Sequence, residues 1–408
     1  QEPEIQGAFL SYESENGFVR AMVGGRDFTK TKFNCALQAK RQVGSTFKPL
    51  IYAAAIDKGY SPSSIVTDSP LVFRYEGKLD ADASAAAGED WKPHNYGNKF
   101  EGDIPIRLAL IRSMNIPTVK ILNEIGVDYG IQYARTLGIT ATLPRDLTIG
   151  LGSWSSSLEE IMRAYAIFPR LGKPVELVYI RKVVAPDGTT VEEHSPKVSP
   201  TPASAPLAGK DQPSLLLEDG RVISPQTAYV MTDMLRGVVR EGTGSAASVV
   251  PGAVAGKTGT SNDHRDAWFI GYSPHMMAGV WLGYEKDKPL DPGETGGRAA
   301  APIWANYMKA VMNNYPKMEF PIPDDIVFAY VDRATGKPAT PSTLKRVRVA
   351  FKVGTVPNAN GDNLLSIGEP GVHNAVTAGP EDPNRSQSSN PGEATEDTTD
   401  YLREGYQN

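Results

Sequence analysis

Val254–Thr260, with the sequence VAGKTGT, is the first of three neighbouring segments that predict β-strands. Asp266–Tyr272 (DAWFIGY) and Met277–Tyr284 (MAGVWLGY) follow it, and both are rich in aromatic and β-branched residues. Ser273-Pro274-His275 separates the last two segments with residues that favour turns. The three segments therefore predict part of a β-sheet.

A second strand region lies at the N-terminal end of the chain. Gly7–Tyr12 and Gly17–Val23 are joined by polar turn residues and predict a hairpin. Between the two strand regions, helical patterns predominate, at residues 45–57, 105–112, 116–125, 127–137, 157–166 and 227–239, and one more follows at 301–314. Strands at both ends around a helical middle predict an α+β fold with an antiparallel sheet built from both chain ends.

The composition narrows the classes of function. The 408 residues carry a net charge of −5, and the segment from Glu369 to Asn408 alone holds eight acidic and two basic residues. The rest is near neutral, whereas a nucleic-acid-binding domain needs a basic body. Cys35 is the only cysteine, so no intrachain disulfide forms, and we expect a buried or incidental thiol. Because the chain has no HExxH motif and no Cys/His cluster, we expect no metal and no cofactor.

Several stretches are predicted to lie outside the core. Residues 76–98 are polar and rich in Ala and Gly, which indicates an exposed excursion, and residues 186–220 suit a strand pair with a long tip. From about Gly368 onward the chain is low in apolar residues, so we expect disorder there. The chain starts with Gln and has no charged-then-apolar leader, so we expect a piece of a longer protein. No run approaches the ~18 apolar residues of a spanning helix.

The most chemically informative pattern is Ser45-Thr46-Phe47-Lys48, at the start of a helix that is apolar nearly all round. Residues three apart share a helix face, so the Lys48 amine is expected near the Ser45 hydroxyl. A serine hydroxyl is a poor nucleophile until a neighbouring base takes its proton. Lys48 serves as that base only if its pKa falls, which burial and a nearby cation, for which Lys257 is the candidate, would cause.

The same pattern occurs a second time, as Ser342-Thr343-Leu344-Lys345. It lies in a region rich in Thr and Pro, with no buried helix and no partner motif after it. We interpret it as a turn without catalytic meaning, because Ser-x-x-Lys alone is common.

Two further motifs complete the set that acyl transfer through a serine ester requires. Ser113-Met114-Asn115 offers a hydroxyl that relays a proton and an amide that holds a substrate carbonyl or the base lysine. Lys257-Thr258-Gly259-Thr260 predicts a strand whose ammonium and hydroxyl groups bind a carboxylate, while Gly259 leaves space for a ligand backbone. The backbone N–H groups of Ser45 and Thr260 are the expected oxyanion donors.

The three motifs, in this order, resemble those of penicillin-binding proteins and class A β-lactamases, with Met114 in place of the usual middle Asp. The flanking sequences are most similar to the transpeptidase domain of class A (bifunctional) penicillin-binding proteins. The similar stretches are QVGSTFKP at 42–49, RSMNIP at 112–117, GKTGTS at 256–261, RAMVGG at 20–25, WKPHNY at 91–96 and DAWFIGY at 266–272.

The resemblance implies a penicillin-binding/β-lactamase-like fold, with about five antiparallel strands, flanking helices and a mostly helical second lobe. It implies a D,D-transpeptidase domain over residues 1–345, followed by a C-terminal extension at 346–368 and a disordered acidic tail at 369–408. The implied catalytic residues are Ser45, Lys48, Ser113, Asn115 and Lys257. The implied oxyanion and substrate-binding residues are Ser45, Thr258, Gly259, Thr260 and Trp154.

The resemblance also implies the partners. Ser45 is expected to attack D-Ala-D-Ala stem peptides of peptidoglycan, and β-lactams are expected to acylate it. From the resemblance we expect the family's membrane anchor and glycosyltransferase domain upstream, outside this sequence, and a site of action on the periplasmic side of the inner membrane. A β-lactamase, a D,D-carboxypeptidase and a non-catalytic penicillin-sensing module are the alternatives.

Two aromatic side chains keep two interpretations each. Trp154, in LGSWSSS at 151–157, either lines the substrate site or packs in the interior. His264, four residues past Thr260, either touches substrate or is an ordinary loop residue. Arg265 and Asp266 are expected to be structural.

Overall fold

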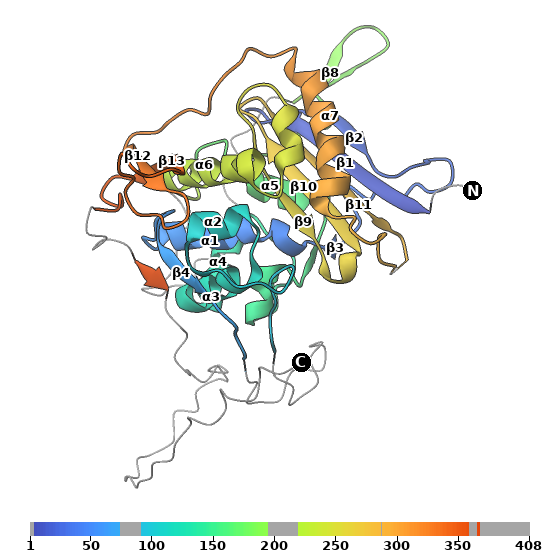
Figure 1. Cartoon of the computed structure of the whole chain (residues 1–408). Coiled ribbons are helices and arrows are strands. Elements are labelled where there is room, and N and C mark those ends of the chain that lie inside the picture. The colour runs from blue at the N-terminus through green and yellow to red at the C-terminus, as the bar shows by residue number, and fades with distance from the viewer. Residues whose placement is uncertain (1–3, 74–90, 195–218, 287, 359–364, 368–408) are drawn as a thin grey trace, which may run out of the picture. The chain divides into compact units, whose positions relative to one another are not determined.

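A five-stranded antiparallel sheet forms the centre of the protein, with the strand order β2-β1-β11-β10-β9 (Figure 1). The computed structural model describes residues 4–73, 91–194, 219–286, 288–358 and 365–367, which belong to one structural unit. The strands are β1 (Ile5–Glu13), β2 (Val19–Val23), β9 (Ala255–Thr260), β10 (Asp266–Tyr272) and β11 (Met276–Tyr284). The predicted sheet from both chain ends is therefore confirmed, including the N-terminal hairpin.

The central strands are buried on both faces, because alternate side chains enter two different apolar clusters. Trp268, Ile270 and Tyr272 of β10 join the large core shared with most helices. Phe269 and the β11 residue Val280 instead face α7 (Ala301–Met312) in a second cluster around Trp304. The two-residue alternation of a strand explains this division.

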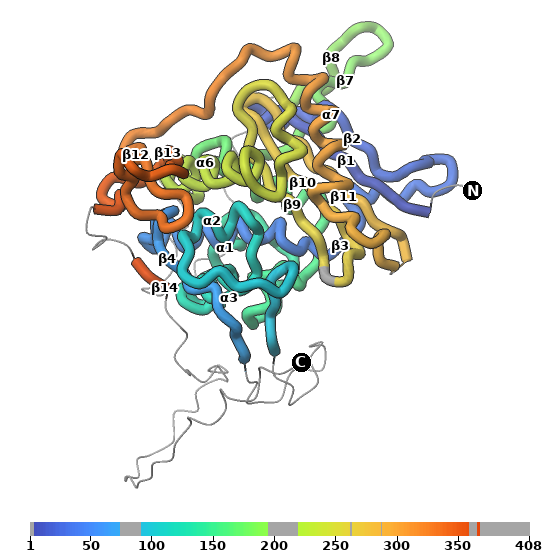
Figure 2. Tube along the Cα trace, viewed as in Figure 1, coloured from blue at the N-terminus to red at the C-terminus, as the bar shows by residue number. Residues whose placement is uncertain are grey.

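The helical part surrounds α1 (Lys48–Asp57), whose residues up to Ile56 are all buried. Helices α2 (Ile106–Ile111), α3 (Asn115–Ile125), α4 (Val127–Thr136) and α6 (Pro225–Glu241) contact α1. Figure 2 shows the blue and cyan tube of α1, α2 and α3 gathered apart from the sheet strands. Helix α6 also contacts β9, so it connects the helical part to the sheet.

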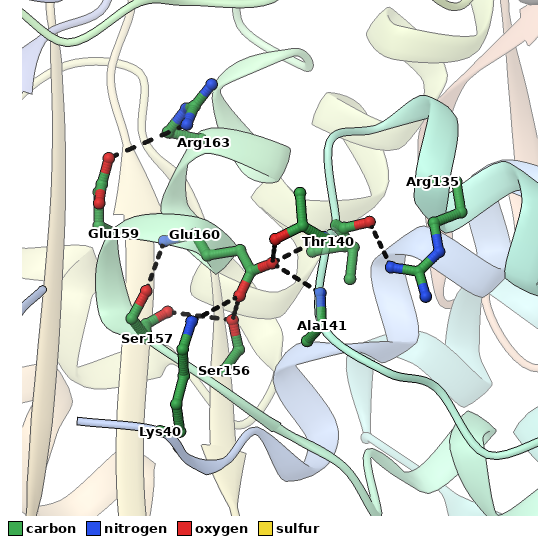
Figure 3. Close-up of polar contacts among 10 residues, drawn as sticks. Lys40, Arg135, Thr140, Ala141, Ser156, Ser157, Glu159, Glu160 and Arg163 are labelled. Atoms are coloured by element: carbon green, nitrogen blue, oxygen red, sulfur yellow. Dashed lines mark hydrogen bonds and ion pairs between the residues drawn. The ribbon is translucent and has the colours of Figure 1, made fainter. Parts of the chain in front are cut away.

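Helix α5 (Leu158–Ala166) packs against β1 and β11 and begins at the predicted cap. Ser157 Oγ accepts the backbone N–H of Glu160, as a capping box requires. The Glu160 side chain, however, does not return to Ser157. It accepts hydrogen bonds from Thr140, Ala141, Ser156 and Lys40 instead (Figure 3).

Short strands decorate this core. They pair as β3 (Arg41–Gln42) with β6 (Ser155–Ser156), β4 (Ile65–Asp68) with β5 (Gly102–Pro105) and β14 (Ser366–Ile367), β7 (Lys182–Val184) with β8 (Thr190–Glu193), and β12 (Ile326–Asp332) with β13 (Arg346–Lys352). Short helical turns are η1 (Gly44–Thr46), η2 (Leu147–Leu151), η3 (Ser245–Val249), η4 (Asn262–His264) and η5 (Gly296–Ala300).

The β12–β13 hairpin was not anticipated from the sequence. Its strands pair from Ile326↔Lys352 to Asp332↔Arg346, and β13 packs on α6. The boundary suggested at residue 345 therefore falls inside a hairpin. The second Ser-x-x-Lys pattern lies in the loop between these strands, where Leu344 is 98% exposed, so its interpretation as a turn is confirmed.

The predicted exposed excursion at 76–98 is confirmed for most of its described part, since Lys92, His94 and residues 96–98 are exposed, but two of its positions are not. Pro93 and Asn95 are buried, and Phe73 pairs with Trp91 through an isolated bridge. The Asn95 side-chain amide forms its hydrogen bonds within the protein instead of with solvent. The polar composition of the stretch alone does not reveal this. The remainder of that excursion, the tip at 195–218 and the acidic tail lie outside the described residues.

Two smaller expectations have clear outcomes. Cys35 is a buried free thiol, as expected. Among the helices of the described part of the chain, none has the length and apolar character needed to cross a bilayer.

Candidate active site

Ser45 lies in the one-turn 3-10 helix η1, directly before α1, and Lys48 is the first residue of α1. The sequence predicted one continuous helix, and the structure divides it into these two parts without changing the three-residue spacing. Ser45 is half-buried, whereas Lys48 has no exposed surface. The hydroxyl is thus reachable while the amine is withdrawn from solvent.

Two glycines hold the Ser45 turn against its neighbours. Gly44 has a φ of +51°, and a Cβ there would lie 2.4 Å from the Thr260 carbonyl oxygen. Gly152 has a φ of +72°, and a Cβ there would lie 2.1 Å from the Gly44 oxygen. Both need glycine for conformation and for space. The close approach brings the end of β9 directly beside the nucleophile.

The Ser113–Asn115 segment supplies the acceptors for Lys48. Lys48 Nζ donates to the carbonyl oxygens of Ser113 (2.7 Å) and Met114 (3.1 Å) and to Asn115 Oδ1 (2.6 Å). Ser113 has a φ of +58°, an uncommon conformation for a residue with a Cβ. Such strain is often found at functional sites. Here it turns the Ser113 carbonyl toward one lysine while its hydroxyl faces another.

That second lysine is Lys257 on β9, which is also fully buried. Its Nζ donates to Ser113 Oγ (2.7 Å) and to the Thr258 carbonyl oxygen (2.9 Å). Ser113 therefore bridges the two lysines, and the three motifs that are far apart in sequence meet in one network.

Burial dominates the electrostatics of this network. Burial lowers the pKa of Lys48 well below its usual value, and the neighbouring Lys257 charge lowers it further. Burial also lowers the pKa of Lys257 to about 7. The predicted cause of Lys48 activation, desolvation plus a nearby cation, agrees with this arrangement.

The hydrogen bonds of Lys48 act in the opposite direction. An ammonium has three N–H donors, and three acceptors surround Nζ, so these contacts favour the charged form. A neutral amine keeps two of the contacts and places its lone pair where the third was. Desolvation of a fully buried charge outweighs one hydrogen bond, since burial shifts a pKa by up to ~3–5 units and a hydrogen bond to a charged group contributes only ~1.5–3 kcal/mol.

The side chains of the KTGT strand have partners within the protein. Thr258 Oγ1 lies 2.7 Å from Thr243 Oγ1, and Thr260 Oγ1 accepts the Gly296 N–H at 3.2 Å. The Thr260 hydroxyl proton remains available to a ligand. A Cβ on Gly259 would lie 2.5 Å from Thr46 Cγ2, so this glycine leaves room for the Ser45 turn. Its predicted role in admitting a ligand backbone stays a prediction.

The aromatic candidates have different surroundings. Trp154 is only 4% exposed and packs edge-on against Phe47, with ring centroids 5.1 Å apart, which favours the interpretation of interior packing. His264 approaches the ring of the exposed Tyr96, at 6.5 Å between centroids. Its contact with a ligand stays a prediction.

Arg265 and Asp266 are structural, as expected. Arg265 pairs with Asp263, at 3.6 Å. Asp266 begins β10, and its Oδ1 accepts from Arg41 Nε (2.7 Å) and Trp281 Nε1 (2.8 Å).

One residue close to the network escaped the sequence argument. Asn95 Oδ1 accepts the backbone N–H groups of Asn115 and Ile116. Asn95 lies in the WKPHNY stretch, which resembles the family, but the sequence alone gave it no chemical role.

The sheet and the network of two lysines around Ser113 together have the arrangement expected of a site for acyl transfer to a serine. Residues 7–309 match the family model described as penicillin binding protein transpeptidase domain. Because this match covers most of the chain, the chain belongs to that family.

Individual relatives agree with this assignment. Penicillin-binding protein 1A of Neisseria lactamica is 36% identical over 329 residues, which are 80% of this chain and 38% of that protein. A crystal structure of penicillin-binding protein 1A from Haemophilus influenzae covers 88% of this chain and 55% of that chain, with a TM-score of 0.76 and 28% identity. PonA1 of Mycobacterium tuberculosis, solved in complex with penicillin V, shares the fold, with a TM-score of 0.62 and 23% identity over 84% of this chain and 85% of that chain. The chain spans 38% of the length of the first of these relatives.

Proposed function

We propose that this chain is a serine D,D-transpeptidase that cross-links peptidoglycan stem peptides through an acyl-enzyme on Ser45. The observation that carries the proposal is the position of Ser113, whose carbonyl and hydroxyl contact the two buried lysines Lys48 and Lys257. These contacts join three separate segments and support a base and a proton relay, while the proposed nucleophile Ser45 lies three residues before Lys48.

In the proposed first step, neutral Lys48 takes the Ser45 proton while Oγ attacks the carbonyl carbon of the penultimate D-Ala. The backbone N–H groups of Ser45 and Thr260 stabilise the oxyanion. The amide C–N bond then breaks, the leaving amine receives a proton through Ser113, and the terminal D-Ala departs. The Lys257 ammonium and the Thr258 and Thr260 hydroxyls hold the terminal carboxylate.

In the second step an amine of a neighbouring stem peptide attacks the Ser45 ester and loses its proton to Lys48, so that a new amide forms and Ser45 is restored. A β-lactam follows the first step, but its C–N bond lies in a ring. The leaving amine stays attached, so the acyl-enzyme persists.

The proposed place of action of the protein is the periplasmic side of the inner membrane, with an upstream glycosyltransferase domain as partner.

A β-lactamase needs a carboxylate that activates water for deacylation. Glu160, a buried acidic residue between Ser113 and Lys257, is poorly suited to activate water. Although burial raises its pKa, hydrogen bonds from Ser156 and Thr140 and the charge of Lys40 lower that pKa to about 2. Donors occupy both carboxylate oxygens (Figure 3), so Glu160 is a weak base.

Labelling with a fluorescent penicillin tests the proposal. We expect a stable adduct, seen as a mass increase and mapped to Ser45, which is absent in Ser45→Ala and unchanged in Ser342→Ala. The proposal is refuted if Ser45→Ala is labelled to the same extent as the wild type, or if the wild type is not labelled.

Turnover then separates the alternatives. Rapid hydrolysis of nitrocefin favours a β-lactamase, and release of D-Ala without cross-links favours a carboxypeptidase. A chain that acylates yet forms no D,D-cross-links on a lipid II polymer, supplied with a glycosyltransferase, is a penicillin-sensing module.

A further inference from the structure

A buried amide lies behind the catalytic network without touching either lysine. Asn95 is only 7% exposed. Its Oδ1 accepts the N–H groups of Asn115 (2.9 Å) and Ile116 (3.1 Å), and its Nδ2 donates to Asp68 Oδ1 (2.7 Å) and to the Lys99 carbonyl (3.1 Å). An amide has two acceptor and two donor positions, so all four are used.

These contacts anchor the first turn of α3. The first N–H groups of a helix have no partner within it, and Met114 at the N-cap offers no side-chain hydrogen bond. Asn95 supplies the missing acceptor from a segment 20 residues away. Asn115 is the first residue of α3, so the amide that holds its backbone also fixes where its side chain begins.

The adjacent His94 fixes the orientation of that side chain. Asn115 Nδ2 donates to the His94 carbonyl oxygen at 2.7 Å, which leaves Oδ1 directed at Lys48 Nζ at 2.6 Å. Behind Asn95, the Asp68 carboxylate is 1% exposed and also accepts the Glu101 N–H at 2.9 Å. A continuous chain of contacts therefore runs from β4 to the lysine.

Resting on the proposed function, we infer that Asn95, held in place by Asp68, is a positioning residue for acyl transfer that keeps the Asn115 amide on the Lys48 amine. An error of ~1 Å in the placement of a reacting group costs about 10²-fold in rate. Asn95 itself takes and gives no proton in the reaction.

The test compares Asn95→Ala, Asn95→Asp and the double variant N95D/D68N with the wild type. In Asn95→Asp two carboxylates face each other, which displaces the side chain at 95. In N95D/D68N the new amide at 68 donates to the new carboxylate at 95, and the N–H groups of Asn115 and Glu101 keep their acceptors. The Lys99 carbonyl oxygen loses its donor in this variant. We expect the second-order rate constant of acylation by a fluorescent penicillin to fall about 10²-fold in both single variants. The double variant should recover part of the lost rate, because only the contact with the Lys99 carbonyl stays broken.

A matched control separates positioning from general destabilisation. Tyr12→Phe removes a buried hydrogen bond outside the network, from the Tyr12 hydroxyl to the Met162 carbonyl at 2.9 Å, between β1 and α5. Thermal unfolding gives the folded fraction of every variant, and acylation is compared per folded molecule. Tyr12→Phe should lower the melting temperature without lowering the rate constant.

The pH profile of acylation gives a readout that a purely structural role does not move. Lys48 faces Lys257 from β9 and the three acceptors of residues 113–115. Displacing the Asn115 amide removes one acceptor, which lowers the pKa of Lys48. The rising limb of the profile should shift to lower pH in Asn95→Ala, which introduces no charge, and should not shift in Tyr12→Phe.

Each outcome decides the inference. Single variants that acylate at the wild-type rate with an unmoved pH profile overturn it, and so does a double variant no faster than Asn95→Asp. If Asn95→Ala does not fold, the comparison of Asn95→Asp with N95D/D68N still decides. A wild type that forms no adduct at all refutes the proposed function instead, so the two failures are distinguishable.

Discussion

The chain contains the Ser-Thr-x-Lys pattern twice, and the two copies lie in very different surroundings. Ser45-Thr46-Phe47-Lys48 leads into a helix buried at the centre of the fold, and Lys48 has no exposed surface. Ser342-Thr343-Leu344-Lys345 lies in a surface loop, where Ser342 Oγ contacts Thr340 Oγ1 at 2.8 Å and Lys345 is exposed. The two copies therefore share their spacing and differ in the burial of the lysine and in the presence of a second lysine beside it.

The largest expected difference is between replacing the lysine of the first motif, Lys48, and replacing the lysine of the second motif, Lys345. Lys48→Met keeps the volume of the buried side chain but removes the base, so acylation should fall by ~10²–10⁴-fold, the usual contribution of general base catalysis. Lys345→Met should leave the rate unchanged. Stopped-flow measurement with a fluorescent penicillin gives both constants, and retained acylation in Lys48→Met refutes its role as base.

The sequence was sufficient for the parts of this site that lie within single segments. The three motifs and the strands around β9 are local patterns, and the antiparallel sheet follows from them. The structure adds what depends on contacts between distant residues. The Gly44–Thr260 approach, the Thr258–Thr243 pair and the Asn95–Asn115 contact join positions whose pairing no local periodicity specifies.

The β12–β13 hairpin was missed for a related reason. Its two strands are separated by a long loop, and Arg346 and Arg348 of β13 are exposed, while Val349 to Phe351 are buried. The packing of β13 on α6 stabilises it, so its existence depends on a helix more than 100 residues earlier in the chain. The predicted boundary at residue 345 overlooked this contact.

The third position of each motif should show the next largest difference. Phe47 has no exposed surface, whereas Leu344 is 98% exposed. Phe47→Ala should lower the free energy of unfolding by ~3–5 kcal/mol, as for other buried aromatic residues. Leu344→Ala should stay within ~0.5 kcal/mol of the wild type. Chemical denaturation monitored by fluorescence measures both values, and similar losses would show that the burial contrast does not control stability.

The second lysine should make acylation depend on pH. Burial lowers the pKa of Lys257 to about 7, and the ammonium form is the one that binds a ligand carboxylate. Above that pH the rate constant should fall about tenfold per pH unit, since one proton must be taken up. Lys257→Met should lose this falling limb, and Lys345→Met should retain it. A limb that begins only near the ordinary lysine pKa would contradict the burial argument.

The lowered pKa of Lys257 also affects the free energy of unfolding, which should rise with pH where the rate constant of acylation falls. The unfolded chain keeps the usual lysine pKa of about 10.5, so between about 7 and 10.5 the unfolded state binds more protons than the folded one. The contribution of Lys257 to stability therefore rises with pH across this window. Denaturation of the wild type and of Lys257→Met at several pH values isolates that contribution.

The smallest expected effect concerns Trp154. Its replacement tests whether the ring packs against the interior side of the Ser45 motif or lies on the substrate side. Its ring packs on Phe47 and is only 4% exposed, so Trp154→Phe should cost stability but keep the aromatic contact. We expect a loss in the free energy of unfolding that is smaller than the ~3–5 kcal/mol of truncation to Ala, because the Phe ring still fills part of the space. The rate constant of acylation per folded molecule should not change, because the ring contacts the motif from the interior. A change in that constant with several β-lactams, at unchanged stability, would instead place Trp154 on the substrate surface.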